Sequence, residues 1–328
     1  MKLGLRLPTF ALDGDFSSYD VLRNYVQRAE ECGVEGFFVI DHLLITPPAY
    51  ACSWHDALTA VSFIAAATKH ARVGTMVLVL PTRNPYFLAK QLASIDVYSG
   101  GRLVLGAGVG WNVREFELAG VPVSKRGRIM DEYLVLLKML WSACKTSFDG
   151  EFFRVRELEM LPKPVQKPHP PIWIGGGSQP FEKIYGEQAR GIERVLARVA
   201  KHADGWIPHS SATAEMAAKD WETVKSYARE YGRDPYNITR IYSNFIYIKQ
   251  PGEPDAEAAK RFSLYSGMDL DYWREYYLLG TVDELARKIR ARINALEGVD
   301  WVVLNPLTFG ESQLRLIADE LFPKIEKQ

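Results

Sequence analysis

Apolar residues in this chain form short continuous runs that alternate with longer stretches of helical periodicity. One run extends from Arg72 to Pro81, and a second extends from Arg102 to Trp111 and contains several glycines. A strand that is apolar at successive positions is buried on both faces, as in parallel sheets. Between the two runs, residues 85–99 carry apolar side chains spaced for one buried helix face. Strand, crossover helix and parallel strand together predict one βαβ unit.

The same alternation continues through the rest of the chain. Further buried strands are predicted at residues 3–8, 36–40, 171–174, 205–208, 238–248 and 299–304. Helices are predicted at residues 17–33, 54–68, 126–141, 192–202, 214–231, 281–296 and 312–325. About eight strands alternating with about eight helices predict a (β/α)8 TIM barrel with insertions, as a single domain over residues 1–328. A doubly wound sheet is the alternative, but Pro8-Thr9-Phe10 after the first strand does not resemble a dinucleotide fingerprint.

Two segments interrupt the alternation. Residues 148–153 predict a β-hairpin with an Asp-Gly turn, and five prolines between positions 162 and 171 make an extended connection after it. Residues 251–255 are expected to begin a polar, exposed insertion.

Composition narrows the classes of partner. The 328 residues are 47% hydrophobic and contain 40 Lys+Arg and 40 Asp+Glu, so charge gives no argument for a nucleic acid or an anionic membrane. No apolar run approaches the roughly 20 residues that span a bilayer, and the N-terminus lacks a signal-peptide pattern. Cys32, Cys52 and Cys144 are unclustered, which favours a reducing cytoplasm. No His, Cys, Asp or Glu cluster has metal-ligand spacing, so no metal is predicted.

The carboxyl ends of the predicted strands carry the candidate chemistry, because barrels bind their ligands there. Asp41 and His42 end the second strand, where the carboxylate could orient an imidazole for proton transfer. The alternative is that Asp41 caps a turn and His42 only packs.

Two glycine segments also follow buried strands. Gly175-Gly176-Gly177-Ser178 could direct backbone N–H groups and a hydroxyl at an anion, or could be a flexible turn. Residues 106–110 are not a GxGxxG motif, because Trp111 stands where the third glycine would be. These glycines either leave room for a flat ring system or serve only close helix–strand packing.

These segments together resemble the bacterial luciferase-like family of flavin and deazaflavin oxidoreductases. The resemblance runs in family order as far as Trp206 and weakens beyond it. It rests on Asp41-His42, residues 74–81 with Arg83-Asn84-Pro85, residues 89–93 and 99–103, Gly108-Val109-Gly110-Trp111 with Glu115-Phe116, residues 126–128 and 131–133, residues 170–176, and Ala203-Asp204-Gly205-Trp206.

The resemblance implies a (β/α)8 barrel, commonly dimeric, that binds FMN or coenzyme F420 at its carboxyl face. It implies a cis peptide between Met76 and Val77 against the central ring of the cofactor, with Asp41, Val109 and Gly110 beside it. It assigns the cofactor phosphate to Gly176, Gly177 and Ser178. In deazaflavin sugar-phosphate dehydrogenases a histidine matching His42 has an acidic partner at the position of Trp111, which argues against that substrate here. Residues 179–201 exceed the usual family spacing.

We therefore predict an oxidoreductase, most simply a monooxygenase that uses reduced FMN and oxygen on a small organic substrate, with His42 and Asp41 as catalytic residues. A flavin reductase is an expected partner, and Trp54 and Trp111 are expected to wall the substrate pocket. Coenzyme F420-dependent hydride transfer is the first alternative, and a non-catalytic flavin-binding protein is the second. A homodimer is expected through the helices at residues 54–68 and 85–99.

Overall fold

A closed ring of eight parallel strands forms the centre of the described chain, which in this computed structural model comprises residues 1–11, 16–180, 182 and 191–326. Hydrogen-bonded neighbours follow the order β1-β2-β3-β5-β8-β9-β10-β12, and β12 pairs again with β1. The strands are β1 (Lys2–Arg6), β2 (Gly36–Val39), β3 (Arg72–Thr75), β5 (Leu103–Gly108), β8 (Ile172–Gly175), β9 (Gly205–Ile207), β10 (Thr239–Ile248) and β12 (Trp301–Pro306). The predicted (β/α)8 barrel is confirmed.

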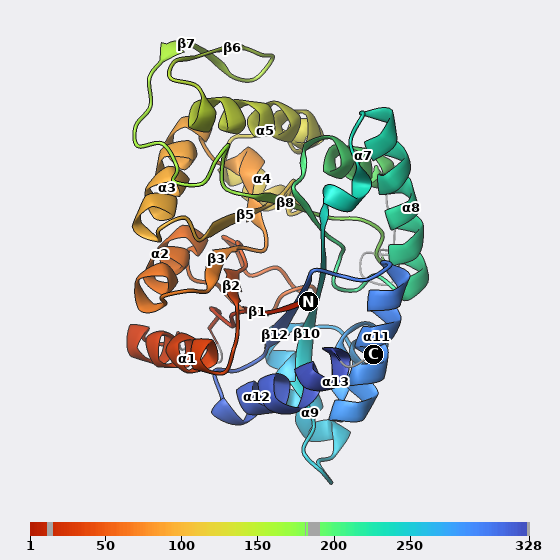
Figure 1. The fold of residues 1–328 in the computed structure, drawn as a ribbon. Helices are drawn as coiled ribbons and strands as arrows, with labels where there is room; N and C mark the ends of the chain where they lie inside the picture. The colour runs from red at the N-terminus through yellow and green to blue at the C-terminus, as the bar shows by residue number, and fades with distance from the viewer. Residues whose placement is uncertain (12–15, 181, 183–190, 327–328) are drawn as a thin grey trace.

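Helices cover the outside of the ring (Figure 1). They are α1 (Tyr19–Glu31), α2 (Ala57–Ala67), α3 (Pro85–Tyr98), α5 (Arg126–Ser142), α7 (Ile192–His202), α8 (Ala214–Glu230), α11 (Val282–Ala295) and the closing run α12 (Glu311–Arg315), η4 (Leu316–Leu321) and α13 (Phe322–Glu326). Short helices α4 (Val113–Leu118), η2 (Val123–Lys125) and η3 (Pro235–Asn237) lie in the connections.

Capping side chains decide where several of these helices begin. Ser18 accepts a hydrogen bond from the Val21 amide at the start of α1, and Thr281 forms a capping box with Glu284 at the start of α11. The helix predicted from Trp54 begins instead at Ala57. Asp56 accepts a 2.8 Å hydrogen bond from the Thr59 amide, so the cap lies three residues later than the apolar pattern indicated.

The strand predicted from Arg72 to Pro81 is interrupted. β3 ends at Thr75, the Met76–Val77 peptide is cis as the family resemblance implied, and β4 (Leu78–Val79) and η1 (Leu80–Thr82) follow. At this point the backbones at the end of β3 and within β5 are in direct contact, and the Thr75 hydroxyl donates a 2.7 Å hydrogen bond to the carbonyl oxygen of Gly106.

Apolar side chains fill the barrel in two layers. The lower layer is a plug of inward-facing residues: Phe38, Met76, Val104, Trp173, Ile207, Ile241, Trp301 and Val303. The upper layer is aromatic and lies at the carboxyl ends of the strands. It includes Phe10, Trp54, Phe245, Phe262, Tyr265, Tyr272, Trp273, Tyr276 and Tyr277.

Much of that upper layer comes from the insertion predicted to be polar and exposed, which is a correction. The insertion folds into α9 (Asp255–Tyr265), α10 (Leu270–Tyr276) and β11 (Leu278–Gly280), and β11 pairs with β10. Its Phe262, Tyr265 and Trp273 side chains are buried over the barrel. The polar residues that begin the segment lie before α9 or at its first position, where Glu253 accepts from the Tyr247 hydroxyl and Asp255 pairs with Lys249.

The predicted hairpin is present but longer. β6 (Thr146–Asp149) and β7 (Arg154–Leu158) pair antiparallel, and Gly150 begins a loop whose ends are joined by its amide and the Phe153 carbonyl oxygen at 2.9 Å. Glu132 of α5 holds this loop by accepting from the Glu151 and Phe152 amides.

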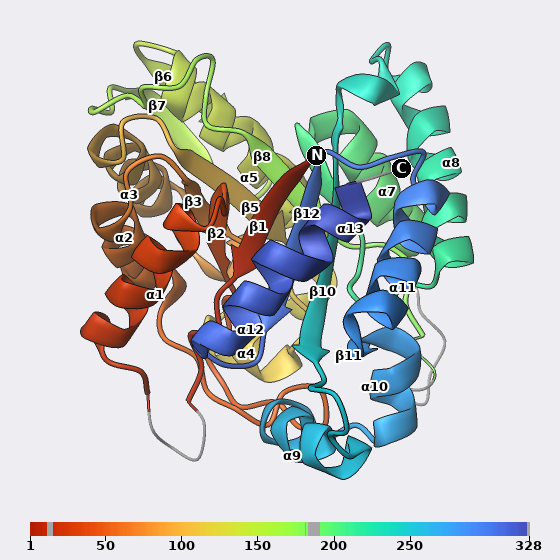
Figure 2. The same cartoon turned by 60° about the horizontal axis from the view of Figure 1, so that its bottom comes forward.

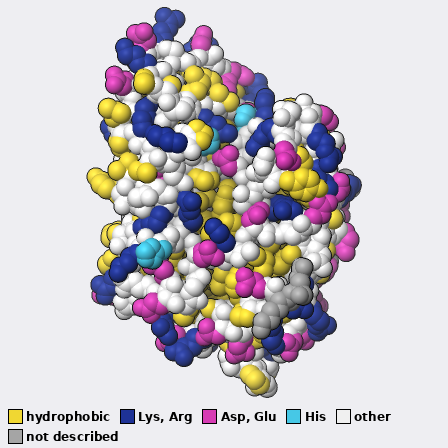
Figure 3. Space-filling model, viewed as in Figure 1, with side chains coloured by type: hydrophobic (Ala, Val, Ile, Leu, Met, Phe, Trp, Pro, Cys, Tyr) yellow, Lys and Arg dark blue, Asp and Glu magenta, His cyan; other side chains and the backbone are white. Residues whose placement is uncertain are grey.

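Charges of both signs are interspersed on the face seen in Figure 3, in line with the balanced composition. Across the described ranges, none of the helices has the length and apolarity that crossing a bilayer requires.

The close approach of β3 and β5 gives a first prediction. A Cβ atom added at Gly106 would lie 2.0 Å from the Thr75 carbonyl oxygen, which no rotamer change relieves. We expect Gly106→Ala to lower the free energy of unfolding by about 1–3 kcal/mol or more, measured as a lower urea midpoint. The matched control is Gly310→Ala, where the nearest atom is the Thr308 hydroxyl at 3.1 Å; a shift there as large as that of Gly106→Ala would contradict the argument.

Candidate active site

The candidate site lies at the carboxyl ends of the barrel strands. Figure 2 shows β10 running toward α9, and α4 lies at the same end of the barrel as α9. Because all ring strands are parallel, the segments after β2, β5, β9 and β10 reach this one mouth. His42 follows β2, and Glu115 lies on α4 after β5.

A carboxylate contacts the His42 ring. Glu115 Oε1 lies 3.3 Å from His42 Nδ1, and both side chains are only 7% exposed. The same oxygen accepts hydrogen bonds from the backbone amides of Leu43 at 3.0 Å and Leu44 at 3.3 Å. Glu115 therefore fixes both the imidazole and the backbone that carries it.

These contacts decide the charge of Glu115. Burial by itself raises the pKa of this carboxyl, but the His42 hydrogen bond and charge, together with the Leu44 and Leu43 amides, bring the pKa below its ordinary value. An ionised Glu115 accepts, so His42 Nδ1 carries the hydrogen and Nε2 is left to exchange a proton. Sequence reasoning gave Glu115 no role, although Glu115-Phe116 was among the segments that carry the family resemblance.

Asp41 does not contact His42 in this way. Its Oδ2 accepts a 3.0 Å hydrogen bond from the Val79 amide, and its Oδ1 forms a 2.8 Å ion pair with Arg83. Asp41 thereby anchors the β4 segment that follows the Met76–Val77 peptide. The carboxylate that orients the imidazole is Glu115, in place of the adjacent Asp41 that the dipeptide suggested.

Aromatic rings surround the imidazole. The ring centroid of His42 lies 4.8 Å from that of Tyr50, 5.8 Å from Trp111 and 6.4 Å from Trp54. Trp54 is buried and its Nε1 has no hydrogen-bond partner among the described residues, whereas Trp111 is 39% exposed. The structure thus brings both predicted pocket tryptophans to His42 and adds Tyr50, which sequence reasoning missed.

The predicted ring-binding segments meet beside these residues. Val77 is packed so closely on the neighbouring strands that a Cβ atom at Gly108 or Gly175 would lie 2.6 or 2.7 Å from its methyl groups. Close packing therefore explains Gly108. It also applies to Gly110, where a Cβ atom would lie 2.6 Å from Val79 and 2.9 Å from Phe116. Val109 and Gly110 are half-buried at the mouth.

The predicted phosphate segment is already engaged within the protein. The Gly176 amide donates to the Ile207 carbonyl oxygen at 3.0 Å. The amide and hydroxyl of Ser178 both donate to the Asp220 carboxylate, at 2.5 and 2.7 Å. Burial raises the pKa of Asp220 although the Ser178 hydrogen bonds lower it, and the net direction is upward. A carboxylate thus faces the site assigned to an anion. Residues 181 and 183–190, part of the long segment noted in the sequence, lie outside the described residues.

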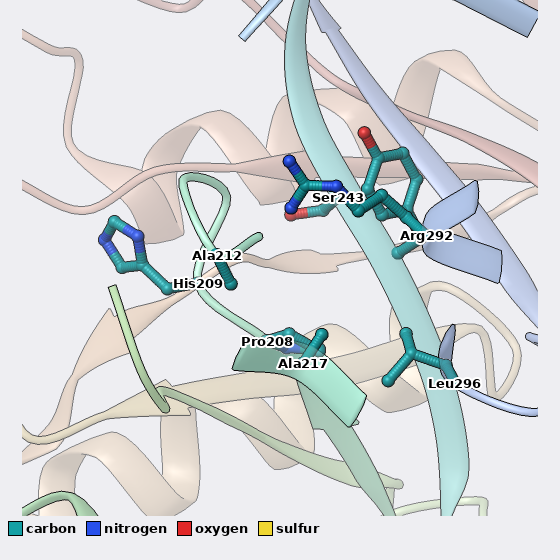
Figure 4. Close-up of a pocket in the computed structure, with 8 residues that line it drawn as sticks. Pro208, His209, Ala212, Ala217, Ser243, Arg292 and Leu296 are labelled. Carbon is teal, nitrogen blue, oxygen red and sulfur yellow. The ribbon is translucent and has the colours of Figure 1, made fainter. Parts of the chain in front are cut away.

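Two hollows lie beside β10. A small cavity of about 10 Å³, room for about one water molecule, is lined by Pro208, His209, Ser243 and Arg292 among others, with the His209 ring pointing away from Ser243 and Arg292 (Figure 4). A second, open cleft of about 630 Å³ lies between Tyr247, Arg261 and the residues before α12. Neither is lined by His42 or Glu115. No group of three His, Cys, Asp or Glu side chains in the described ranges could hold a metal ion.

Comparison with known proteins shows which enzymes the chain is similar to. The chain is 29% identical over 313 residues to an FMNH2-dependent dimethylsulfone monooxygenase of Pseudomonas putida, covering 89% of this chain and 84% of the relative. It is 24% identical over 323 residues to an F420-dependent glucose-6-phosphate dehydrogenase of Amycolatopsis mediterranei (strain U-32), covering 93% and 94%. Among solved structures, an F420-dependent secondary alcohol dehydrogenase in complex with an F420-acetone adduct superposes with a TM-score of 0.80 at 18% identity, covering 99% and 98%.

The family profile described as luciferase-like monooxygenase matches residues 1–295. That match covers most of the chain, including the His42 and Glu115 segments and the strands around them. The chain therefore belongs to the luciferase-like monooxygenase family, as its motifs predicted.

Proposed function

We propose that this protein is a monooxygenase that uses reduced FMN and oxygen on a small organic substrate bound at the barrel mouth. The observation that carries the proposal is the His42–Glu115 pair inside an aromatic enclosure at the carboxyl ends of the strands. The predicted class, a flavin- or F420-dependent oxidoreductase, agrees with the relatives and with the family.

The residues at the mouth fit the flat part of such a cofactor. The segments Met76–Val77 and Val109–Gly110 would flank the ring, and the indole Nε1 of Trp54 is a buried donor without a partner among the described side chains. The anionic part fits less simply, because Asp220 occupies the donors of Ser178. Bound reduced FMN would supply the electrons for oxygen activation.

This chain's own residues would manage protons and exclude water. Glu115 holds the Nδ1 hydrogen of His42, which leaves Nε2 to give or take a proton. Tyr50, Trp54 and Trp111 surround the imidazole with apolar surface, which strengthens electrostatic interactions by excluding water. Asp41 acts on the backbone through Val79 and Arg83. Its proposed contribution is therefore to hold the ring-binding segment in place.

Coenzyme F420-dependent oxidation is the second candidate, because an F420-dependent dehydrogenase aligns over almost the whole chain. Trp111 argues against the sugar-phosphate substrate of that relative. Fluorescence titration of the purified protein with reduced FMN and, separately, with F420 decides between the two. Binding of F420 alone would overturn the FMN proposal. Binding of either without turnover of any substrate would favour a non-catalytic flavin-binding protein.

We further propose that a separate flavin reductase supplies reduced FMN and that the protein resides in the cytoplasm. Residues 1–328 are proposed to form one domain.

The His42–Glu115 pair generates a prediction about turnover. General acid–base help is worth about 10² to 10⁴ in rate, so we expect His42→Ala to lower kcat by a factor in that range with little change in FMN affinity. Glu115→Gln keeps the shape but loses the charge that orients the imidazole. It should lower kcat by a smaller factor, about tenfold to a hundredfold. Weaker FMN binding with unchanged kcat in His42→Ala would assign His42 to packing.

The same pair has a dependence on pH. Because folding lowers the pKa of Glu115, this group stabilises the protein fully above the ordinary glutamate pKa of about 4.3 and loses that contribution as the pH falls through the folded value. The difference in melting temperature between wild type and Glu115→Gln should therefore shrink as the pH is lowered below about 4. A difference that is constant from pH 7 to pH 3 would contradict this assignment.

Asp220 tests where the cofactor phosphate binds. If the phosphate lies at Gly176–Ser178, removing a negative charge within a few ångströms should favour it by at least about 1 kcal/mol. We therefore expect Asp220→Asn to bind FMN at least about fivefold more tightly. Asp149→Asn on the hairpin is the matched control and should leave the affinity unchanged. Equal affinities in wild type and Asp220→Asn would place the phosphate elsewhere.

Exposed aromatic side chains on α2 and α3 support the proposed homodimer. Phe63 is 48% exposed, Phe87 73% and Tyr98 89%. Such residues gather at protein interfaces. Light scattering at micromolar concentration should give twice the chain mass of 37.1 kDa, and Phe87→Asp with Tyr98→Asp should give the single-chain mass. A particle of 37.1 kDa for the wild type would refute the dimer.

A further inference from the structure

A guanidinium group lies buried inside the barrel mouth. Arg6 is the last residue of β1 and is only 6% exposed. Its Nε donates a 3.0 Å hydrogen bond to Asn305 Oδ1, and its Nη2 reaches the Ser210 hydroxyl at 3.5 Å. The group also lies 4.3 Å from the centre of the Phe245 ring. Arg6 therefore stands directly above the apolar plug, held by neutral partners from β12, β10 and the segment after β9.

No carboxylate among the described residues forms an ion pair with Arg6. The titratable groups that act on it are the phenols of Tyr265, Tyr50 and Tyr277, whose pKa values burial raises, so they are neutral at pH 7. Its other titratable neighbour, His209, has its pKa lowered to about 4 by burial and by Arg6 itself, so it too is neutral. The positive charge is thus uncompensated by the described side chains.

Another buried arginine of the same chain shows the ordinary arrangement. Arg198, on α7, has a side chain only 5% exposed and donates to the Asp131 carboxylate at 2.6 Å. Burying a charge without a partner is costly, and arginine keeps its proton even where burial lowers its pKa, as it does for Arg6. An unpaired buried arginine at a ligand-binding mouth is therefore a sign of a negatively charged ligand.

A continuous aromatic wall joins Arg6 to His42. From Phe245, the ring of Tyr265 lies 4.3 Å away, the ring of Tyr50 lies 5.3 Å beyond it, and His42 lies 4.8 Å from Tyr50. The contacts of Arg6 come from β10, β12 and the segment after β9, whereas the predicted ring-binding segments follow β3 and β5. Arg6 thus lies across the mouth from the predicted cofactor, on the side left for substrate.

We propose that the substrate carries a compact oxyanion, the chemistry shared by carboxylates and sulfonates, which Arg6 binds with Asn305 and Ser210. The apolar part of the substrate then lies along the aromatic wall and extends toward His42, where the reaction takes place. This inference rests on the proposed function for the reacting end only. The anion site itself stands on the contacts of Arg6.

Paired probes of equal shape test the anion site. Benzoate and benzamide differ in charge, and their binding to the cofactor-free protein at pH 7 can be followed by tryptophan fluorescence. A charge-assisted hydrogen bond to a buried guanidinium should make benzoate bind at least about tenfold more tightly. Arg6→Met should abolish that preference, and Arg6→Lys should keep part of it. Equal binding of both probes to the wild type, or an unchanged preference in Arg6→Met, would overturn the proposal.

Stability provides a second, independent measurement. Replacing an unpaired buried charge by an apolar side chain of similar length should raise the melting temperature, as expected for a group kept for function. Arg198→Met is the matched control and should lower the melting temperature, because it leaves Asp131 without its partner. A fall with Arg6→Met as large as that with Arg198→Met would show that Arg6 is structural and would sink the proposal.

Titration with FMN separates this inference from the proposed function. Arg6→Met should leave FMN affinity within about twofold of wild type, and a loss of tenfold or more would assign Arg6 to the cofactor and overturn the substrate site. A wild-type protein that prefers benzoate but binds no FMN would refute the flavin proposal and leave the anion site standing.

Discussion

Closure of the parallel ring through the β1–β12 pairing is the constraint on which the rest of this structure depends. It pairs residues 2–5 with residues 301–304, so the first and last strands of the ring are neighbours in one barrel. Because all strands of the ring run in the same direction, the segments that follow the strands all lie at the same end of the barrel. Arg6 and Asn305, 299 positions apart in the sequence, are in contact because β1 pairs with β12.

Charge is distributed at this mouth in an uneven way. Glu115 is buried, yet it is satisfied by an imidazole and two backbone amides, so it remains ionised and rigid. Arg6 is equally buried and has only neutral partners. Asp220 takes the donors of Ser178 that an anion would use. The fold supplies hydrogen-bond partners for the charge of Glu115, whereas the charge of Arg6 is proposed to find its partner in a ligand. A protein that keeps such an unpaired charge loses stability in exchange for binding.

The enclosure of the mouth is built by elements outside the barrel. The segment after β2 supplies Tyr50 and Trp54, and the α9–α10 insertion after β10 supplies Tyr265 and Trp273. The barrel itself is shared with structures of low sequence identity, whose names describe alcohol dehydrogenases and monooxygenases alike. A shared barrel does not fix the activity, so in the proposed function these loops and the few polar groups under them would select the substrate.

Local information was enough for the fold and for the family. Runs of buried residues, helical periodicity and the caps at Ser18 and Thr281 depend on neighbours within a few positions, so the sequence by itself determined the strands, the helices and the barrel. It also brought His42, Trp54 and Trp111 into one hypothesis through the family motifs, and His42 with both tryptophans does form one cluster.

Partner choice over long separations was decided only by the tertiary structure. Asp41 is adjacent to His42 in sequence, but its carboxylate binds the Val79 amide and Arg83. The carboxylate that contacts His42 is that of Glu115, 73 residues away in the sequence. The sequence did not show that the aromatic side chains of the α9–α10 insertion are buried, because their burial depends on packing against the end of the barrel. Asp220 against Ser178, and Arg6 without a carboxylate, follow equally from which strands are neighbours in the ring. A hydrogen bond or an ion pair forms only when two groups lie within a few ångströms of each other. The sequence does not give that distance for residues far apart in the chain, and the packing of the strands does.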